Sequence, residues 1–216
     1  MRLGVFGGTF DPIHIGHLVA AQNAMHAAQL DRVLFIVANQ PWQKEGTREV
    51  TDAQLRHLVV TQVLAPIPGL EPSDIEIRRG GLSYSIDTLI ELHDAQPADE
   101  LFLVVGADAA SQMPTWERAE ELSRLARLVI VNRYGYPTIS HILDFDEPIL
   151  AEMPWLDISS TDLRERVRDH RPLQFLLPAT AIDAIERFAL YREQHPRNAM
   201  TGEDQGRPTG SSARLD

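Results

Sequence analysis

The sequence contains no cysteine, and this absence excludes several kinds of chemistry. Without cysteine there is no disulfide bond, no thiolate nucleophile and no structural zinc site built on cysteine. Basic residues are also few, with 20 lysines and arginines against 31 aspartates and glutamates and a formal net charge of −11. Because general nucleic-acid and membrane-surface binders present a basic face, this balance predicts a protein that binds neither.

Long apolar runs are missing as well. No stretch approaches the roughly 20 apolar residues that a membrane-spanning helix needs. The first residues begin a strand pattern rather than the apolar core of a signal peptide, so we expect a cytoplasmic protein. The 216 residues suffice for one α/β domain and are too few for a tRNA synthetase with its tRNA-binding modules.

The most informative feature that is present is the run GGTFDPIHIGH at residues 7–17. It follows a short apolar segment, residues 3–6, and precedes a helix-like segment, residues 18–28. Glycines without side chains let backbone N–H groups approach a bulky anion, and the helix N-terminus downstream adds partial positive charge at the same place. The run therefore predicts a phosphate-binding turn.

His14 and His17 stand three residues apart at the start of this helix, which brings both imidazoles to one face. Imidazolium donors there would neutralise charge that develops on a phosphate in a transition state. A tight turn and two satisfied surface histidines would explain each residue taken alone. The complete run favours the phosphate site.

Apolar segments predict the strands of one sheet. They cover residues 3–6, 32–37, 73–77, 101–105, 127–131 and 149–153, and the alternation within 73–77 is typical of an edge strand. Six helices are predicted. They cover residues 18–28, residues 51–64 with a capping box at Thr51, a segment that starts at Ser85, a segment that contains Trp116 and ends at residue 125, residues 139–145 and residues 180–194. Strands separated by helices indicate a Rossmann-like, doubly wound α/β fold in a single domain, residues 1–194. Residues 195–216 are predicted to be a disordered tail, because almost nothing in them can be buried.

A second turn of the same kind follows the strand at residues 101–105. Gly106 comes directly after it, and Asp108 either caps the next helix or accepts a hydrogen bond from a ribose hydroxyl. If the first and fourth strands are neighbours, the turns at Gly7 and Gly106 face each other across one crevice. We expect the ligand there.

Two further segments carry candidate site residues. In ISSTDLR, residues 158–164, three hydroxyls at a helix start lie near Arg164, which is one turn after Ser160 on the same face. In GGLSYSIDTL, which starts at Gly80, Tyr84 either walls a ring-binding pocket or staples the helix that Ser85 caps, and residue chemistry alone favours the staple. Arg56 lies on the helix predicted over residues 51–64, and its side chain faces either solvent or the cleft.

With these motifs in this order, residues 3–191 resemble the bacterial nicotinate mononucleotide adenylyltransferases of the nucleotidyltransferase superfamily. The resemblance implies that ATP and nicotinate mononucleotide are joined with release of pyrophosphate, with Mg²⁺ held mainly by the ATP phosphates and water and no protein metal site. It gives catalytic roles to His14, His17 and Arg164. It assigns ATP to Gly7, Gly8, Phe10, His14, His17, Gly106, Asp108, Ile158, Ser160, Thr161 and Arg164. It assigns the mononucleotide to Thr9, Lys44, Tyr84, Ser85, Thr88, Trp116 and Arg133, with the pyridine ring stacked on Trp116, and it leaves a homo-oligomer open.

The chain departs from the family pattern at two places. Pro41, Trp42, Gln43 and Lys44 stand where many members have Pro-Pro-His-Lys, and Ser85 stands where threonine is usual. Pantetheine-phosphate adenylyltransferases and glycerol-phosphate cytidylyltransferases share the opening motif but not SYSIDTL. The letters HIGH also occur in class I aminoacyl-tRNA synthetases, which length, acidity and the lack of a KMSKS-like run disfavour. The alternative that is not an enzyme is a nucleotide-binding sensor with the same fold.

Overall fold

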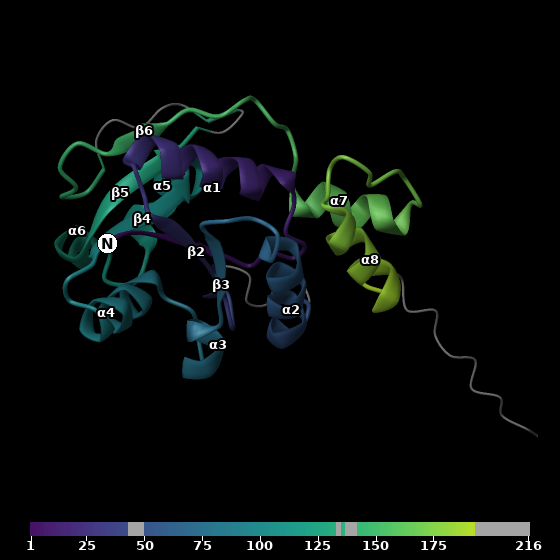
Figure 1. Ribbon diagram of the computed structural model, residues 1–216, viewed down its shortest axis with the longest axis horizontal. Helices are drawn as coiled ribbons and strands as arrows, with labels where there is room; N and C mark the ends of the chain where they lie inside the picture. Colours follow the sequence, from purple (N-terminus) through teal and green to yellow (C-terminus); the bar gives the residue numbers. More distant parts are fainter. Residues whose placement is uncertain (43–49, 133–134, 137–141, 193–216) are drawn as a thin grey trace, which may run out of the picture.

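A six-stranded sheet, parallel throughout, forms the centre of the computed structural model, which describes residues 1–42, 50–132, 135–136 and 142–192 (Figure 1). The strand order is β3-β2-β1-β4-β5-β6. The strands are β1 (Arg2–Gly8), β2 (Arg32–Val37), β3 (Leu70–Ser73), β4 (Glu100–Gly106), β5 (Ala126–Val131) and β6 (Ile149–Ala151). The predicted Rossmann-like doubly wound sheet is confirmed.

The central strands are nearly continuous apolar runs because both of their faces are covered. Alternate side chains enter two separate cores. In β4, Leu101 and Leu103 pack into one core, whereas Phe102 and Val104 pack into the other. Burial on both sides stabilises the sheet through the apolar area that is removed from water.

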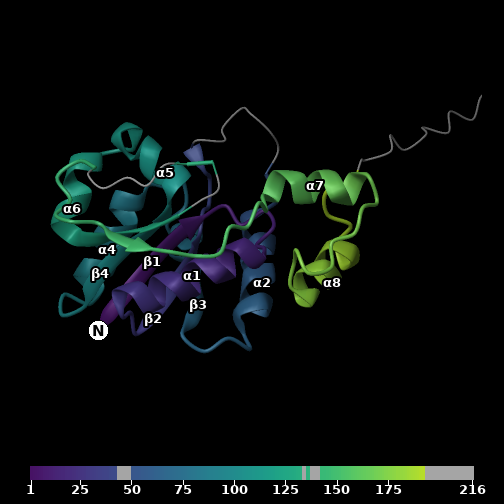
Figure 2. The same cartoon turned by 90° about the horizontal axis from the view of Figure 1, so that it is seen from above.

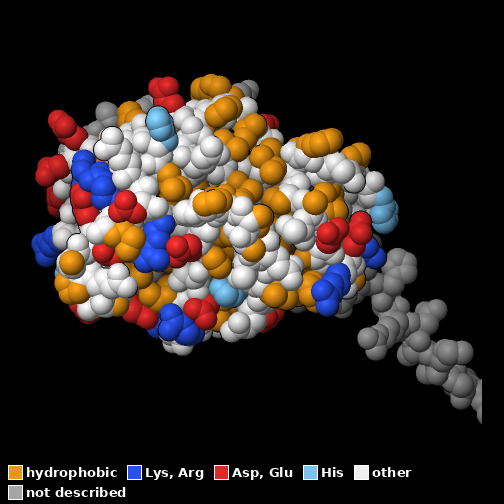
Figure 3. Space-filling view, in the orientation of Figure 1, with side chains coloured by type: hydrophobic (Ala, Val, Ile, Leu, Met, Phe, Trp, Pro, Cys, Tyr) orange, Lys and Arg blue, Asp and Glu red, His pale blue; other side chains and the backbone are white. Residues whose placement is uncertain are grey.

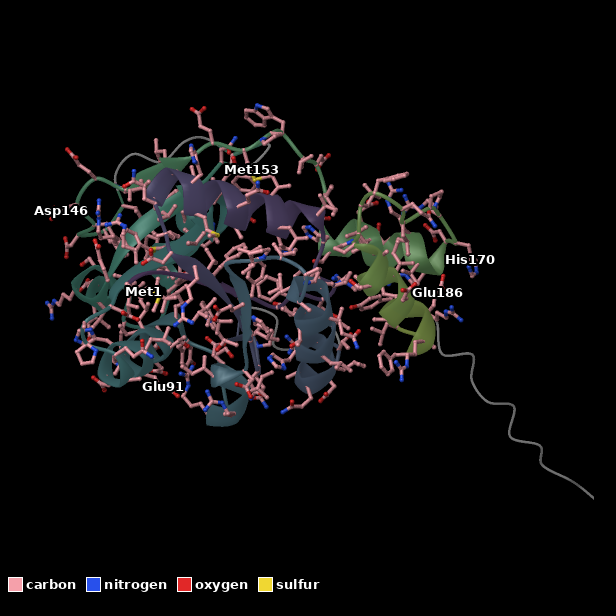
Figure 4. All side chains as sticks on the ribbon, viewed as in Figure 1. Met1, Glu91, Asp146, Met153, His170 and Glu186 are labelled. Atoms are coloured by element: carbon pink, nitrogen blue, oxygen red, sulfur yellow. The ribbon has the colours of Figure 1, made fainter. Side chains whose placement is uncertain are left out.

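Helices cover the two faces of the sheet (Figures 1 and 2). One face carries α1 (Ile15–Ala28) and α2 (Ala53–Leu64). The other carries α3 (Ile75–Arg79), α4 (Ser85–Ala95), α5 (Ala107–Gln112) and α6 (Leu122–Leu125). The last helices, α7 (Ser160–Arg168) and α8 (Ala179–Arg187), lie beyond one end of the sheet, where α8 packs beside α2. Figure 4 labels Met153 just after β6, His170 between α7 and α8, and Glu186 in α8.

The winding of the chain reverses between β1 and β4. From β1 the chain moves outward through β2 to β3, and from β4 it moves outward the other way through β5 to β6. The first and fourth strands are hydrogen-bonded neighbours, with Leu3 opposite Leu101 and Val5 opposite Leu103. The predicted juxtaposition of the two strand-end turns is therefore confirmed.

The strand predicted over residues 73–77 is wrong. Strand β3 is Leu70–Ser73, paired with β2, and the following residues form helix α3. Arg78 Nε donates to Asp74 Oδ1 at 2.9 Å, a pair four residues apart that a helix brings together. The apolar residues Ile75 and Ile77 looked like strand alternation, but of these two isoleucines only Ile75 is buried in the short helix.

Four helix predictions also need correction. Asp52, not Thr51, caps α2, and its side chain accepts from the N–H of Leu55 at 3.1 Å. The segment around Trp116 is not one helix: α5 ends at Gln112, two 3₁₀ turns follow at Met113–Thr115 and Ala119–Glu121, and Arg118 has a left-handed φ of 49°. Helix α8 begins after Pro178 and ends at Arg187 rather than near residue 194. Residues 142–145 form a turn instead of a helix, and residues 139–141 and 195–216 lie outside the described residues.

The surface of the described residues carries charges of both signs. On the face shown in Figure 3, acidic and basic side chains lie interspersed along the left and lower edges. Several form ion pairs, for example Arg2 with Glu100 at 2.9 Å and Arg32 with Glu71 at 2.9 Å. Among the described helices, none is both long and apolar enough to cross a membrane.

Candidate active site

A cavity of about 680 Å³ opens where β1 and β4 end. Its floor is made by residues of both strand ends, including Gly7 and Gly8 of β1 and Gly106 of β4. Ligands of doubly wound sheets bind outside the carboxyl ends of the strands at the point where the winding reverses. The cavity lies at this point, as the sequence predicts.

The turn after β1 depends on one close approach. A Cβ added at Gly8 would lie 2.8 Å from the ring of Phe10, so only glycine fits there. Phe10 has a left-handed φ of 49° and is 3% exposed, and its ring lies edge-on to His17 with centroids 5.1 Å apart. Phe10 lines the cavity, and its ring also packs against Phe6 and Phe35.

The two histidines of the turn lie against each other in the cavity wall. Their ring centroids are 3.7 Å apart, and the backbone N–H of His14 donates to Nδ1 of His17 at 3.1 Å. Since Nδ1 of His17 accepts this hydrogen bond, the proton of the neutral ring is on Nε2. His17 is thereby prepared as an Nε2–H donor, a neutral form of the donor that the sequence predicts.

Arg56 faces neither solvent nor the cleft. It is 2% exposed and donates to four backbone carbonyls, at 2.7 Å to Thr51, Thr9 and Ala38 and at 3.2 Å to Asn39. It therefore ties the turn after β1 to the loop after β2. The signal was available in the sequence, because Arg56 shares a helical face with Val59, Val60 and Val63.

The motif at residues 158–164 contacts the turn after β1. Ser160 Oγ donates to the carbonyl of Pro12 at 3.0 Å, and Arg164 Nη1 donates to the carbonyl of Asp11 at 2.8 Å. Arg164 Nη2 also donates to Thr161 Oγ1 at 3.1 Å. The predicted shared face of Ser160 and Arg164 is confirmed, but of this motif only Ile158 lines the cavity within the described structure. Phosphate contacts by Ser160, Thr161 and Arg164 stay predictions.

A buried carboxylate reinforces the same contact. Asp11 is 1% exposed, and Oδ1 accepts from the hydroxyl of Tyr191 at 2.8 Å. Burial, and then the negative charge of Asp11, raise the pKa of the Tyr191 hydroxyl far above its usual range, so this hydroxyl stays a donor. Sequence reasoning missed this pair, whose members are 180 positions apart.

Aromatic side chains line one end of the cavity. Trp42 and Tyr84 have ring centroids 6.4 Å apart, and Trp116 and Ser85 also line this end. The indole Nε1 of Trp116 is buried and has no hydrogen-bond partner among the residues that the structure describes. Such a donor suits a ligand acceptor. Tyr84, for which residue chemistry alone favoured a staple, lines the cavity, while Lys44 and Arg133 lie outside the described residues.

The other end of the cavity is built from β4, β5 and the segment before α7. Gly106, Asp108 and Ile158 line it. A Cβ added at Gly106 would meet the Asp108 carboxylate at 2.6 Å, so this carboxylate lies directly beside the strand end. Gly106 is the N-cap of α5, so the predicted capping role of Asp108 is wrong. The ribose contact of Asp108 stays a prediction, as do the ligand contacts of Gly7, Gly8 and Thr9.

Thr88 is not part of the cavity wall as the structure describes it. It is 1% exposed, and its hydroxyl donates to Glu76 Oε1 at 2.7 Å. Glu76 itself lines the cavity, and burial raises the pKa of its carboxyl above the usual value. Glu76 was not among the predicted site residues, because the alternation within residues 73–77 is typical of an edge strand with Glu76 on its exposed face.

Within the described residues, no group of three or more histidine, aspartate or glutamate side chains is arranged to hold a metal ion. These residues therefore do not fit a resident metal. That the phosphates of a nucleotide and water would hold Mg²⁺ stays a prediction.

Comparison with known proteins agrees with this geometry. A family model described as cytidylyltransferase-like matches residues 5–166. A probable nicotinate-nucleotide adenylyltransferase of Corynebacterium kroppenstedtii is 44% identical over 192 residues, which cover 88% of this chain and 90% of that protein. The chain belongs to the nicotinate-nucleotide adenylyltransferase family. Proteins of the same name from Leifsonia xyli subsp. xyli and Mycobacterium tuberculosis are each 42% identical, over 88% of this chain and 94% and 91% of theirs.

Solved structures confirm the fold of this adenylyltransferase. The Plasmodium falciparum nicotinic acid mononucleotide adenylyltransferase complexed with NaAD matches with a TM-score of 0.76 and 19% identity, over 88% of this chain and 97% of that one. The same Plasmodium protein complexed with APC matches with a TM-score of 0.73 and 18% identity, over 88% and 96% of the two chains. At these identities the likeness concerns the fold.

Proposed function

We propose that this enzyme transfers the adenylyl group of ATP to nicotinate mononucleotide, forming nicotinate adenine dinucleotide and pyrophosphate in NAD biosynthesis. The observation that carries the proposal is the arrangement of one cavity. Trp42 and Tyr84, which follow β2 and β3, and Gly106 and Asp108, at the end of β4, line the same cavity as His14 and His17. The imidazoles of His14 and His17 follow β1, which stands between β2 and β4 in the sheet. Two nucleotides placed end to end would meet at these imidazoles.

The proposed reaction needs no protein nucleophile. A phosphate oxygen of the mononucleotide attacks the α-phosphorus of ATP, a P–O bond forms there, and the bond to the β-phosphate breaks as pyrophosphate leaves. The protein positions both phosphates and stabilises the charge that shifts onto pyrophosphate. The Nε2–H of His17 is the donor that the hydrogen bond from His14 prepares.

We assign the adenosine to Gly7, Gly8 and Phe10 and to the end lined by Gly106, Asp108 and Ile158. The pyridine nucleotide is assigned to Thr9, Tyr84, Ser85 and Trp116, with its ring on Trp116. Ser160, Thr161 and Arg164 are proposed to bind the ATP phosphates together with His14 and His17, and Lys44 and Arg133 are proposed to bind the mononucleotide. Mg²⁺ is proposed to enter with ATP, since the described residues form no metal cluster. Cytoplasmic location, homo-oligomerisation and the lack of nucleic-acid binding stay predictions.

Pyrophosphate release tests the proposal. The enzyme is assayed with ATP and Mg²⁺ together with either nicotinate mononucleotide or nicotinamide mononucleotide. We expect release that requires both nucleotides and is faster with the acid, because N–H groups at the aromatic end would pair with the pyridine carboxylate. Comparable rates would overturn the preference for the acid, and ATP binding without any release would favour the nucleotide sensor.

A further inference from the structure

The carboxylate of Glu76 is buried in the wall at the aromatic end of the cavity. Glu76 lies on α3 and is 6% exposed. Burying a carboxylate is costly unless donors surround it. Thr88 Oγ1 donates to Oε1 at 2.7 Å and the Arg79 guanidinium lies 3.9 Å away. The nearby Ser83 hydroxyl favours the charged form and so opposes the rise in the pKa of the Glu76 carboxyl. Glu76 therefore joins α3 to segments on both sides of the start of α4.

The other hydrogen bonds of the two hydroxyls set the direction of this network. Thr88 Oγ1 accepts from Arg79 Nη2 at 2.9 Å, and Ser83 Oγ accepts from the backbone N–H of Asn39 at 2.8 Å. A hydroxyl has one proton, and of the two acceptors of the Thr88 hydroxyl, Glu76 Oε1 at 2.7 Å is much closer than the carbonyl of Tyr84 at 3.4 Å. A carboxylate, with two oxygens that only accept, matches both hydroxyls.

The network encloses the residues that begin α4. Ser83 and Thr88 stand before and after Tyr84 and Ser85, which line the cavity. The Ser83 N–H donates to the carbonyl of Gln40 at 3.0 Å, so the same segment is also tied to the loop after β2. The first N–H groups of a helix have no partner inside the helix, and their position depends on how the helix start is held.

We propose that Glu76 is a positioning residue for the pyridine nucleotide, acting through Ser83 and Thr88 to hold the start of α4 against the cavity. The inference rests on the proposed function. It goes further because it names a residue that sets the affinity for the pyridine nucleotide without having to touch it. The backbone N–H groups of Tyr84 and Ser85 then meet the pyridine carboxylate in a fixed geometry. Loss of the network weakens binding of the mononucleotide and leaves the ATP end unchanged.

Three variants test this role. Thr88→Val keeps the shape of the buried side chain and removes the hydroxyl, Thr88→Ser keeps the hydroxyl, and Glu76→Gln replaces one acceptor oxygen with a donor. Thr61→Val is the matched control, because the Thr61 hydroxyl donates to the carbonyl of His57 at 2.8 Å on α2, on the other face of the sheet. For each variant, kcat, the KM for nicotinate mononucleotide and the KM for ATP are measured.

We expect Thr88→Val and Glu76→Gln to raise the KM for nicotinate mononucleotide about tenfold, because the start of α4 is then no longer held in the geometry that binds the pyridine carboxylate. The KM for ATP should stay within about twofold of wild type, and Thr88→Ser should restore most of the affinity. An unchanged KM for the mononucleotide, an equal rise for both substrates, or the same effect in Thr61→Val would overturn the inference.

The wild-type enzyme separates this inference from the proposed function. A wild type that releases no pyrophosphate from ATP and nicotinate mononucleotide contradicts the proposed function. Calorimetric titration of the same variants with nicotinate mononucleotide then tests the inference alone: weaker binding by Thr88→Val, restored by Thr88→Ser, supports it. Equal binding by all variants, or no binding by wild type, overturns it.

Discussion

The imidazole of His17 combines a structural and a chemical role in one residue. Its Nδ1 accepts from the N–H of His14 at the start of α1, and its ring rests edge-on against Phe10. These contacts hold the remaining ring nitrogen, Nε2, as a donor in the cavity wall. A donor held in place before the reaction stabilises the transition state without reorganisation.

Replacing His17 with alanine should therefore lower kcat on the order of 10²-fold or more, the effect of losing one transition-state donor. The KM values should change much less, because the donor acts mainly on charge that develops in the transition state. Steady-state pyrophosphate release gives both constants. The control is His26→Ala, an exposed histidine in the last turn of the same helix. A His17→Ala enzyme with near wild-type kcat would remove His17 from the mechanism.

Glu76 predicts a pH dependence of stability. Burial raises the pKa of its carboxyl in the folded state, against the opposing effects of the Ser83 and Thr88 hydroxyls and of the Arg79 guanidinium, and Asp87 on α4 acts in the same direction as burial. A raised folded pKa means that the stabilising contribution is fully present below the unfolded value near 4.5 and is lost as the pH rises through the folded pKa. Glutamine does not titrate, so Glu76→Gln lacks this dependence.

Thermal melts of wild type and Glu76→Gln across about pH 4 to 7.5 measure this effect. The Tm of wild type relative to Glu76→Gln should fall as the pH rises through the folded pKa of Glu76. A Tm difference that stays constant with pH, or that grows in favour of wild type, would show that burial does not disfavour the charged carboxylate.

At the scale of elements, α7 and α8 act as a brace for the turn after β1. Arg164 and Ser160 of α7 donate to the carbonyls of Asp11 and Pro12, and the N–H of Ile15 donates to the carbonyl of Leu176 between the two helices at 3.1 Å. Tyr191, just after α8, reaches the Asp11 carboxylate. The last described part of the chain thus holds the turn that carries both histidines.

Tyr191→Phe should lower the free energy of unfolding by about 1–3 kcal/mol, because it leaves a buried carboxylate with one donor fewer. Urea unfolding followed by circular dichroism measures the loss. Tyr136→Phe, at a tyrosine that is 46% exposed, is the control and should change little. Equal stability of Tyr191→Phe and wild type would mean that water or another donor replaces the Tyr191 hydroxyl.

The elements also show how far the sequence predicts the fold. Five of the six strands match the predicted segments within a few residues, because short, near-continuous apolar runs are typical of parallel strands that are covered on both faces. Residues 73–77 were assigned to the wrong element, since two isoleucines separated by one residue occur in a single helical turn as well as in a strand.

Long-range partners set the limit of what the sequence predicts about the site. His14, His17 and Gly106 were predictable, because each follows directly from the turn after an apolar strand. The partners that define the roles of Glu76, Arg56 and Tyr191 are 12, 47 and 180 positions away, at Thr88, Thr9 and Asp11. Local patterns carry no information about such pairs.

For the whole molecule, the reversal of the winding between β1 and β4 explains why one cavity can serve two nucleotides. The reversal leaves the ends of β1 and β4 side by side without a crossover helix between them. Each half of the sheet then supplies its own part of the wall. Trp42 follows β2 and Tyr84 follows β3 in one half, and Ile158 follows β6 in the other. The two histidines lie between these parts.

The central claim is that the α-phosphorus of ATP is transferred to the mononucleotide in this cavity. The most direct test incubates the enzyme, Mg²⁺ and nicotinate mononucleotide with ATP labelled with ³²P at either the α- or the γ-phosphate. We expect the α label in the dinucleotide and the γ label in pyrophosphate. Transfer of the γ label to the mononucleotide would contradict the account. So would consumption of ATP with no α label in any dinucleotide product.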